Sequence, residues 1–171
     1  KFLETINFFL KNKDISILKI NKKNRKFHAR FSAKERIYNY IIFNRSSEPS
    51  LNKLRGWHIK KKLDIKLMII GSKKLLGTKD FATFRSSNCG AKSSIKTLKS
   101  VRIKIKGEKI EIKFKSKSFL KQQVRSMVGC LKYLGEKKWN LEKFIKVMNS
   151  KKRSFCAPPA PPHGLYLEKV I

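Results

Sequence analysis

Acidic residues are scarce in this 171-residue sequence: 11 Asp and Glu stand against 43 Lys and Arg, which gives a formal net charge of +32. So few carboxylates limit the options for acid–base catalysis, and the sequence contains neither a paired-carboxylate pattern nor a phosphate-binding glycine loop. Asp14, Asp64 and Asp80 each have a structural explanation, at a predicted strand entrance, a helix N-cap and an aromatic turn respectively. The residues alone therefore display no complete catalytic set.

Cysteine, histidine and long apolar runs are also rare. Cys89, Cys130 and Cys156 lie far apart and form no CxxC pair, so we expect reduced thiols, no zinc or other metal, and a cytoplasmic location. No run approaches the roughly 18 uncharged apolar residues of a membrane span, so we expect no membrane partner. The histidines are equally scattered, and none can be paired with a nucleophile by proximity: His28, His58 and His163.

We do not expect the start of the sequence to be a secretion signal, because Glu4 and Asn7 interrupt its apolar pattern and no small-residue cleavage site follows. The first residue is not methionine, so we expect the sequence to begin within a longer protein. Its length is that of one domain of ordinary size.

The excess of positive charge indicates a polyanionic partner, and nucleic acid is the obvious one. Phosphate contacts of this kind are independent of sequence and weaken as salt rises. An alternative explanation for part of the excess is a coding bias toward AT-rich codons, since most of the cations are lysine and isoleucine and asparagine are also abundant.

The stretch from Ser118 to Gly135 predicts one amphipathic helix, with Ser118 as N-cap and Gly135 as a left-handed C-terminal residue. Arg125 lies on the flank of its apolar stripe, in a row with Gln122 and Gly129. A glycine in the middle of a helix indicates a close backbone approach. Arg125 is either a solvated side chain beside a packing glycine or a functional residue. The stripe consists of Leu120, Val124, Met127, Val128, Leu131 and Leu134.

The remaining patterns predict a helix within residues 4–12, a short strand over 15–20, and then the elements of an α+β domain. These are a central strand over 34–43, a helix from Asp64 to Gly77, a hairpin of 98–106 and 109–116, the helix described above, a helix capped by Asn140, and a strand over 165–171. This order predicts a ferredoxin-like (split βαβ), mostly antiparallel sheet with helices packed on one face. Residues 80–94 are expected to form a turn and a mobile loop.

Tyr38 and Tyr40 share one face of the central strand and could stack on an unpaired base. Aromatic residues on strands are more often part of the core. From the residues alone, the alternatives are an RNA-binding α+β domain without catalytic activity and a basic structural protein of a ribonucleoprotein particle.

Four motifs in fixed order resemble those of the tRNA pseudouridine synthase A (TruA) family: FHARFSA with the strand RIYNYIIFN, LLGTKDFATFR, FLKQQVRSMVG, and APPHGLYL. The resemblance covers essentially the whole chain. It implies a pseudouridine synthase type of α+β fold, no cofactor, tRNA as partner, isomerisation of uridine in the anticodon stem-loop, and a homodimer.

The resemblance also assigns residues. Tyr38 falls on the family's substrate-contacting tyrosine beside the target base, and Arg125 falls on the arginine that pairs with the catalytic aspartate. That aspartate is the nucleophile: it is thought to attack the ribose or the uracil ring, after which the freed uracil rotates and rejoins through carbon. The target uridine must leave its stack to be reached.

One departure from the family pattern is large. The aspartate belongs to a GRTDAGVH-type motif, which these 171 residues do not contain. We therefore expect residues 1–26 to be the end of an N-terminal half, residues 27–171 to be the C-terminal domain, and the chain alone to be inactive. A smaller departure is Gln122–Gln123 in place of the family's two histidines, which leaves Arg125 but is expected to alter how its helix is supported.

Overall fold

The computed structural model of the protein describes residues 1–171, which divide into two compact units, Lys1–Ser32 and Ala33–Ile171. The smaller unit contains one helix, α1 (Phe2–Phe9), with no buried residue. Residues 15–20 form no strand, so the expectation of one there, with Asp14 at its entrance, is wrong. Their backbone is held instead by a side chain: the Asn7 amide donates to the carbonyl of Ile17 (2.9 Å) and accepts from its N–H (2.8 Å).

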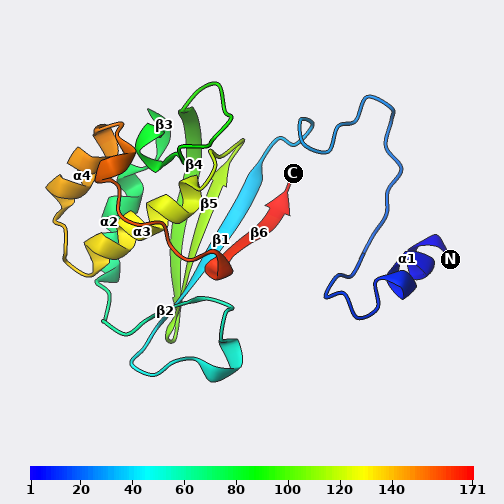
Figure 1. Cartoon of the computed structure of the whole chain (residues 1–171), viewed down its shortest axis with the longest axis horizontal. Coiled ribbons are helices and arrows are strands. Elements are labelled where there is room, and N and C mark those ends of the chain that lie inside the picture. Colours follow the sequence, from blue (N-terminus) through cyan, green and yellow to red (C-terminus); the bar gives the residue numbers. More distant parts are fainter. The chain divides into compact units, whose positions relative to one another are not determined.

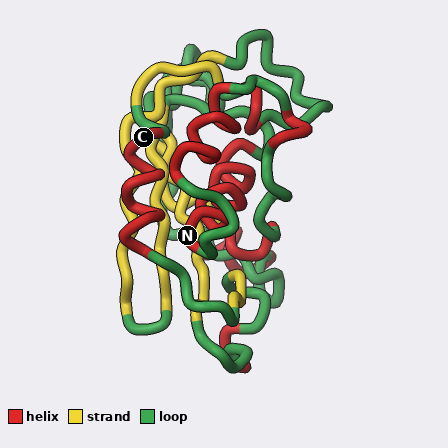
Figure 2. The backbone as a smooth tube through the Cα atoms, turned by 90° about the vertical axis from the view of Figure 1, so that its left-hand side faces the viewer, coloured by secondary structure: helices red, strands yellow, loops and turns green.

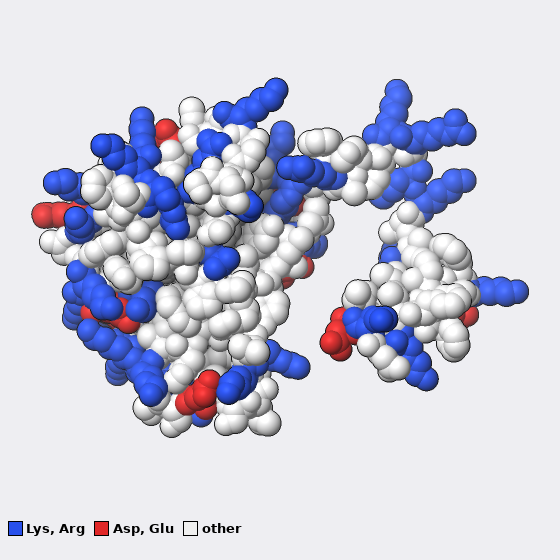
Figure 3. Space-filling model, in the orientation of Figure 1, with Lys and Arg blue, Asp and Glu red and all other residues white.

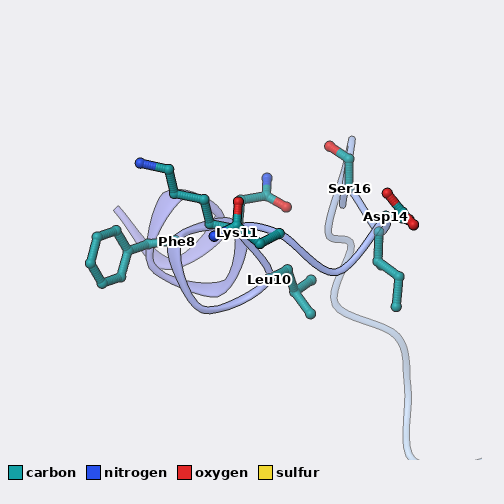
Figure 4. Close-up of a pocket in the computed structure, with 8 residues that line it drawn as sticks. Phe8, Leu10, Lys11, Asp14 and Ser16 are labelled. Atoms are coloured by element: carbon teal, nitrogen blue, oxygen red, sulfur yellow. The ribbon is translucent and has the colours of Figure 1, made fainter.

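A shallow pocket of about 400 Å³ belongs to this smaller unit (Figure 4). Its walls come from α1 and the chain that follows it, and include Phe8, Leu10, Lys11, Asp14 and Ser16. Neither Tyr38 nor Arg125 is among the residues that line it.

The larger unit is a six-stranded sheet with three α-helices on one face (Figures 1 and 2). Its sheet order is β2-β1-β5-β4-β3, with β6 paired to β1, and all pairs except β1–β2 are antiparallel. The predicted α+β fold with split βαβ order is therefore confirmed. The strands are β1 (Arg36–Asn44), β2 (Trp57–Ile59), β3 (Gly77–Asp80), β4 (Ile95–Lys106), β5 (Lys109–Ser116) and β6 (Leu165–Val170). The helices are α2 (Ile65–Lys74), α3 (Gln123–Gly135) and α4 (Leu141–Asn149).

Strand β1 is central, as its two apolar faces predict. One edge pairs with β5, and the other edge is shared by β6 over residues 36–40 and by β2 over residues 42–44. The sequence did not predict β2 or β3. They have three and four residues, too few to show the alternation that identifies a strand.

The hairpin β4–β5 supplies much of the core. Ile110, Ile112 and Phe114 on β5 are fully buried against the helices, as predicted. On β4 the pattern holds less well, because Ile105 is 56 % exposed. This part of β4 lies near the hairpin tip at Gly107, which extends past the end of the helix layer (Figure 1).

Helix α3 begins four residues later than predicted, at Gln123, so its N-cap is Gln122 and not Ser118. The preceding residue, Gln122, has a left-handed backbone (φ 63°), which breaks the helix at that point. The side chain of Gln123 then accepts a hydrogen bond from the N–H of Leu120 (2.8 Å), and Ser118 is held by the hydroxyl of Ser116. The row of Gln122, Arg125 and Gly129 is therefore helical only from Arg125 onward.

The predicted apolar stripe is nevertheless buried throughout, because the turn before α3 folds onto the same core. Its members are Leu120, Val124, Met127, Val128, Leu131 and Leu134, none of them more than 4 % exposed. Hydrophobic contact with the sheet, more than helix propensity, thus sets the position of α3.

Gly135 has a different role from the one expected. It is the last helical residue and does not adopt the left-handed conformation, which is taken by Lys137 (φ 58°). A Cβ on Gly135 would lie 2.7 Å from the sulfur of Met68 on α2. The glycine therefore permits α2 and α3 to approach each other closely.

Two of the three predicted N-caps are confirmed. The Asp64 carboxylate accepts a hydrogen bond from the N–H of Leu67 (3.0 Å), and the Asn140 side chain accepts one from the N–H of Lys143 (2.8 Å). Helix α2 ends at Lys74, earlier than the predicted end at Gly77, and Gly77, with φ +95°, is the first residue of β3. No helix of the structure combines the length and apolar character needed to cross a membrane.

The prediction of a close backbone approach at Gly129 is also confirmed. A Cβ built on Gly129 would overlap the carbonyl oxygen of Pro158, in the proline-rich segment that crosses α3. Because that neighbour is backbone, it cannot rotate away as a side chain could.

We predict that Gly129→Ala destabilises the fold by about 1–3 kcal/mol, since overlap with the backbone outweighs the roughly 1 kcal/mol that alanine gains in a helix. Urea unfolding of the 171-residue chain measures the change. Gly90→Ala is the matched control, because a Cβ there meets no atom within 4 Å. Equal unfolding midpoints for the two variants would contradict the prediction.

Candidate active site

Tyr38 and Tyr40 lie on the helix-covered face of β1, but their environments differ. Tyr40 is completely buried, so the core interpretation is confirmed for this residue. Tyr38 is half-buried, and its ring meets the edge of Phe119 at 5.2 Å between centroids and 87° between planes. Its partner on the neighbouring strand β6 is Leu167, which is 54 % exposed. This end of the face is therefore open to solvent.

Arg125 lies in the first turn of α3 and is half-buried. Its Nε donates a hydrogen bond to the carbonyl of Ala160 (2.6 Å), and its own carbonyl accepts one from the N–H of Ala160 (3.0 Å). These two bonds fix both the backbone and the base of the guanidinium. The two terminal nitrogens of Arg125 form no hydrogen bond or ion pair within the chain.

The segment 156–164 holds this arrangement from one side. Pro158 packs on Gly129 of α3, and the carbonyl of Pro161 accepts a hydrogen bond from the hydroxyl of Tyr40 (2.7 Å). Gly164 lies against the Tyr40 ring, since a Cβ there would come within 2.8 Å of it. The prolines restrict the backbone conformations of this segment, so it forms a stiff support for the arginine.

Tyr40 also connects the strand with Arg125 electrostatically. Burial raises the pKa of the Tyr40 hydroxyl well above its usual range, and the positive charge of Arg125 opposes part of that shift. Tyr40 therefore stays protonated and serves as a hydrogen-bond donor. Tyr38 and Arg125 form no bond with each other. Tyr38 contacts Phe119, shortly before α3, and the charge of Arg125, in the first turn of α3, acts on Tyr40, two residues from Tyr38 on β1. We call this region, where β1 meets the start of α3, the junction.

Two loops border this junction. The N–H of Ser86 donates to the carbonyl of Lys121 (3.1 Å), and the N–H of Lys121 donates to the sulfur of Cys89 (3.4 Å). The Arg85 guanidinium donates to the carbonyls of Cys89 and Ala91. Backbone N–H groups of Lys121 and Ala91, with the charge of Arg85, lower the pKa of the Cys89 thiol. The loop after DFATFR is thus tied to the turn before α3.

No carboxylate forms an ion pair or hydrogen bond with Arg125. Asp64 caps α2, and the Asp80 carboxylate accepts a hydrogen bond from the N–H of Ala82 (2.9 Å). In every ion pair of the chain, the Asp or Glu side chain pairs with a lysine, with Arg45 or with the N-terminal amino group. No group of three or more His, Cys, Asp or Glu side chains lies close enough together to hold a metal ion.

On β4 and β5, the sheet face opposite the helices carries mainly cations. Alternation along β4 and β5 places on it Arg102, Lys104, Lys106, Lys109, Lys113 and Lys115. Three glutamates neutralise it in part: Glu35 pairs with Lys115 (2.6 Å), Glu111 with Lys109 (2.8 Å) and Glu168 with Lys113 (2.7 Å). On the side of the larger unit seen in Figure 3, cations crowd the left and upper margins, and the centre is mostly neutral.

The contribution of segment 156–164 is the feature that sequence reasoning missed. Its prolines predicted only a turn, and Tyr40 gave no sign of its bond to Pro161. One signal was available: Gly129 in mid-helix indicated a close backbone neighbour, although not which one.

Comparison with known proteins identifies the family. A sequence profile described as tRNA pseudouridine synthase matches residues 72–171. The tRNA pseudouridine synthase A of Pelagibacter ubique (strain HTCC1062) is 69 % identical over 171 residues, which is 100 % of this chain and 70 % of that protein. Proteins of the same name from Caulobacter vibrioides (strain NA1000 / CB15N) and Zymomonas mobilis are 42 % and 40 % identical, over 96 % and 100 % of this chain and 67 % and 70 % of their own lengths. Because the similarity extends over the whole chain, the chain belongs to the tRNA pseudouridine synthase A family.

Proposed function

We propose that this chain supplies the arginine and the base-contacting tyrosine of a synthase that isomerises uridine to pseudouridine in the anticodon stem-loop of tRNA. The observation that carries the proposal is Arg125: a half-buried guanidinium, anchored through Nε, whose terminal nitrogens form no hydrogen bond or ion pair within the chain. A buried or half-buried charge is costly without a partner, and the fork of an arginine fits a carboxylate in two-point contact.

In this proposal the missing partner is the nucleophilic aspartate of a GRTDAGVH-type motif, which residues 1–171 do not contain. Arg125 would hold that carboxylate ionised and oriented toward the target uridine. The bond from Nε to Ala160 leaves the two terminal nitrogens to face the carboxylate, so segment 156–160 acts as the positioning support.

Tyr38 is proposed to contact the target base. Its ring is half-buried at the open end of the β1 face, and Phe119 fixes its orientation edge-on. A flipped base stacked on such a ring recovers part of the free energy lost when it leaves the RNA stack. Tyr40, with its hydroxyl bonded to Pro161, has no such freedom.

The net charge of +32 supports an RNA partner, and the cations of the open sheet face provide phosphate contacts. We further propose a homodimer and a cytoplasmic location, on the strength of the family resemblance. The free state of all three cysteines is compatible with a reducing compartment.

We also propose that residues 1–26 end an N-terminal half and that residues 27–171 form the C-terminal domain. Helix α1 buries none of its residues within this chain, and large apolar side chains of the smaller unit are exposed: Phe2, Phe8, Phe9, Ile15, Leu18 and Ile20. Such a concentration of apolar surface suits packing against a further part of the protein.

The first prediction is that the 171-residue chain alone releases no tritium from tRNA carrying tritium-labelled uridine, because it lacks the nucleophile. A chimera in which the preceding part of the Pelagibacter ubique relative is joined to this chain is expected to be active. Turnover by the chain alone would contradict the proposal for the aspartate. A folded but inactive chimera would contradict the proposed activity itself.

The second prediction concerns Arg125 in that chimera. Arg125→Ala is expected to lower kcat by about 100-fold or more, since it removes the cation that orients the nucleophile. Arg125→Lys keeps the charge but loses the fork and the bond to Ala160, so an intermediate loss is expected. Arg55→Ala, in the loop before β2, is the matched control, because its side chain is exposed. Equal kcat values for Arg125→Ala and the control would exclude the proposed role.

The third prediction separates the contribution of the Tyr38 hydroxyl from that of its ring. Tyr38→Phe keeps the ring contact with Phe119 and is expected to lower kcat about tenfold, because it removes the hydroxyl that we propose contacts the target base. Tyr38→Leu also removes the stacking surface, so KM for tRNA should rise as well. Tyr166→Phe, whose hydroxyl bonds only to the carbonyl of Arg55, is the control and should leave both constants unchanged. Wild-type constants for Tyr38→Leu would remove Tyr38 from the site.

A further inference from the structure

Two cysteines that the proposed reaction does not use lie in contact within the core. Cys130 is on α3 and 1 % exposed, and Cys156 is half-buried at the start of the proline-rich segment. They are 26 positions apart in sequence, yet their sulfur atoms are 3.4 Å apart. We propose that Cys130 and Cys156 form a redox-active thiol pair, which a hydroperoxide converts into an intramolecular disulfide and a thiol reductant restores.

The geometry suits bond formation. A disulfide requires the sulfur atoms to come to about 2.05 Å, so they must close by roughly 1.4 Å. Cys156 follows a short 3₁₀ helix, Arg153–Phe155, and has extended backbone with no strand partner. It can therefore move toward α3 without breaking a sheet or a long helix.

The two thiols have distinct chemical roles. The hydrogen bond from Cys130 and the nearby charge of Arg153 lower the pKa of the Cys156 thiol, whereas the same bond and burial raise the pKa of Cys130. Arg153 is held in place, because its guanidinium also donates to the Ser126 hydroxyl (3.0 Å). Cys156 is thus the more exposed and the more easily ionised of the pair, as a first-reacting thiol must be.

The reaction balances with a hydroperoxide as the oxidant. The Cys156 thiolate attacks the outer oxygen of the O–O bond, which gives a sulfenic acid and releases hydroxide from hydrogen peroxide. The Cys130 sulfur then attacks the Cys156 sulfur. The S–O bond breaks, the proton of Cys130 and the hydroxyl group leave as water, and the S–S bond forms. The peroxide gains the two electrons that the thiols lose, and two equivalents of reduced thiol return them.

The site differs from an isolated reactive thiol because its partner is already in contact. Cys89 serves as the internal comparison: its pKa is also lowered, but its sulfur contacts backbone N–H groups and no second thiol. Oxidation there would stop at the sulfenic acid or proceed to higher acids. A disulfide between Cys130 and Cys156 would tie α3 to the segment that supports Arg125, and the proposal stands whether or not the chain has synthase activity.

The experiment titrates the folded 171-residue chain in the Cys89→Ser background with hydrogen peroxide, followed by alkylation, proteolysis and mass spectrometry without reductant. We expect the free thiols to fall from two to none, a peptide pair linked through residues 130 and 156, and full recovery with dithiothreitol. In Cys89→Ser/Cys130→Ser, Cys156 should accumulate as a sulfenic acid that a dimedone probe traps.

Unfolding of the same sample provides the second measurement. The disulfide is expected to raise the midpoint of thermal unfolding by roughly 5 °C relative to the reduced form, since it closes a loop in the unfolded chain. Three outcomes would each overturn the proposal. The first is that two free thiols persist after peroxide treatment, and the second is a disulfide only between separate chains. The third is that Cys156 is oxidised equally with and without Cys130 and no crosslink forms.

Discussion

The contact between helix α3 and the proline-rich segment is the constraint on which the candidate site depends. Gly129 lets the backbone of Pro158 approach the helix, and Ala160 then makes reciprocal hydrogen bonds with Arg125. A side chain at Gly129 would push this support away. The orientation of one charged side chain therefore depends on the absence of a Cβ one helical turn further along the chain.

The same contact connects the sheet with the helix layer. Tyr40 lies in the middle of β1, its hydroxyl donates to the carbonyl of Pro161, and its ring contacts Gly164. The strand, the proline-rich segment and helix α3 are therefore held in one arrangement. Burial keeps the Tyr40 hydroxyl protonated, which makes it a permanent donor. Rigid support of this kind is what a catalytic arginine needs, because a displacement of about 1 Å at the reacting groups can cost two orders of magnitude in rate.

The candidate active-site residues and most of the lysines of β4 and β5 lie on different faces of the larger unit. Tyr38 lies on the helix-covered face of the sheet and Arg125 on helix α3, which covers that face, and both are half-buried. The lysines of β4 and β5 lie on the other face and are partly neutralised by glutamates. Specific recognition and non-specific attraction of a polyanion can therefore be altered separately by mutation.

The sequence by itself determined the order of the main elements, the central position of β1, two N-caps and the apolar stripe of α3. These follow from periodicity and local capping, which act over a few residues. The short strands β2 and β3 and the role of Gly135 against Met68 depended on neighbours distant in sequence. The start of α3 at Gln123 and the missing strand at residues 15–20 depended on nearer contacts that periodicity does not show, the left-handed backbone of Gln122 and the side chain of Asn7. Motif resemblance selected Tyr38 and Arg125. Only the tertiary structure decided what supports Arg125 and that Cys130 lies beside Cys156, because hydrogen bonds and packing across 26 to 121 positions leave no periodic trace in the chain.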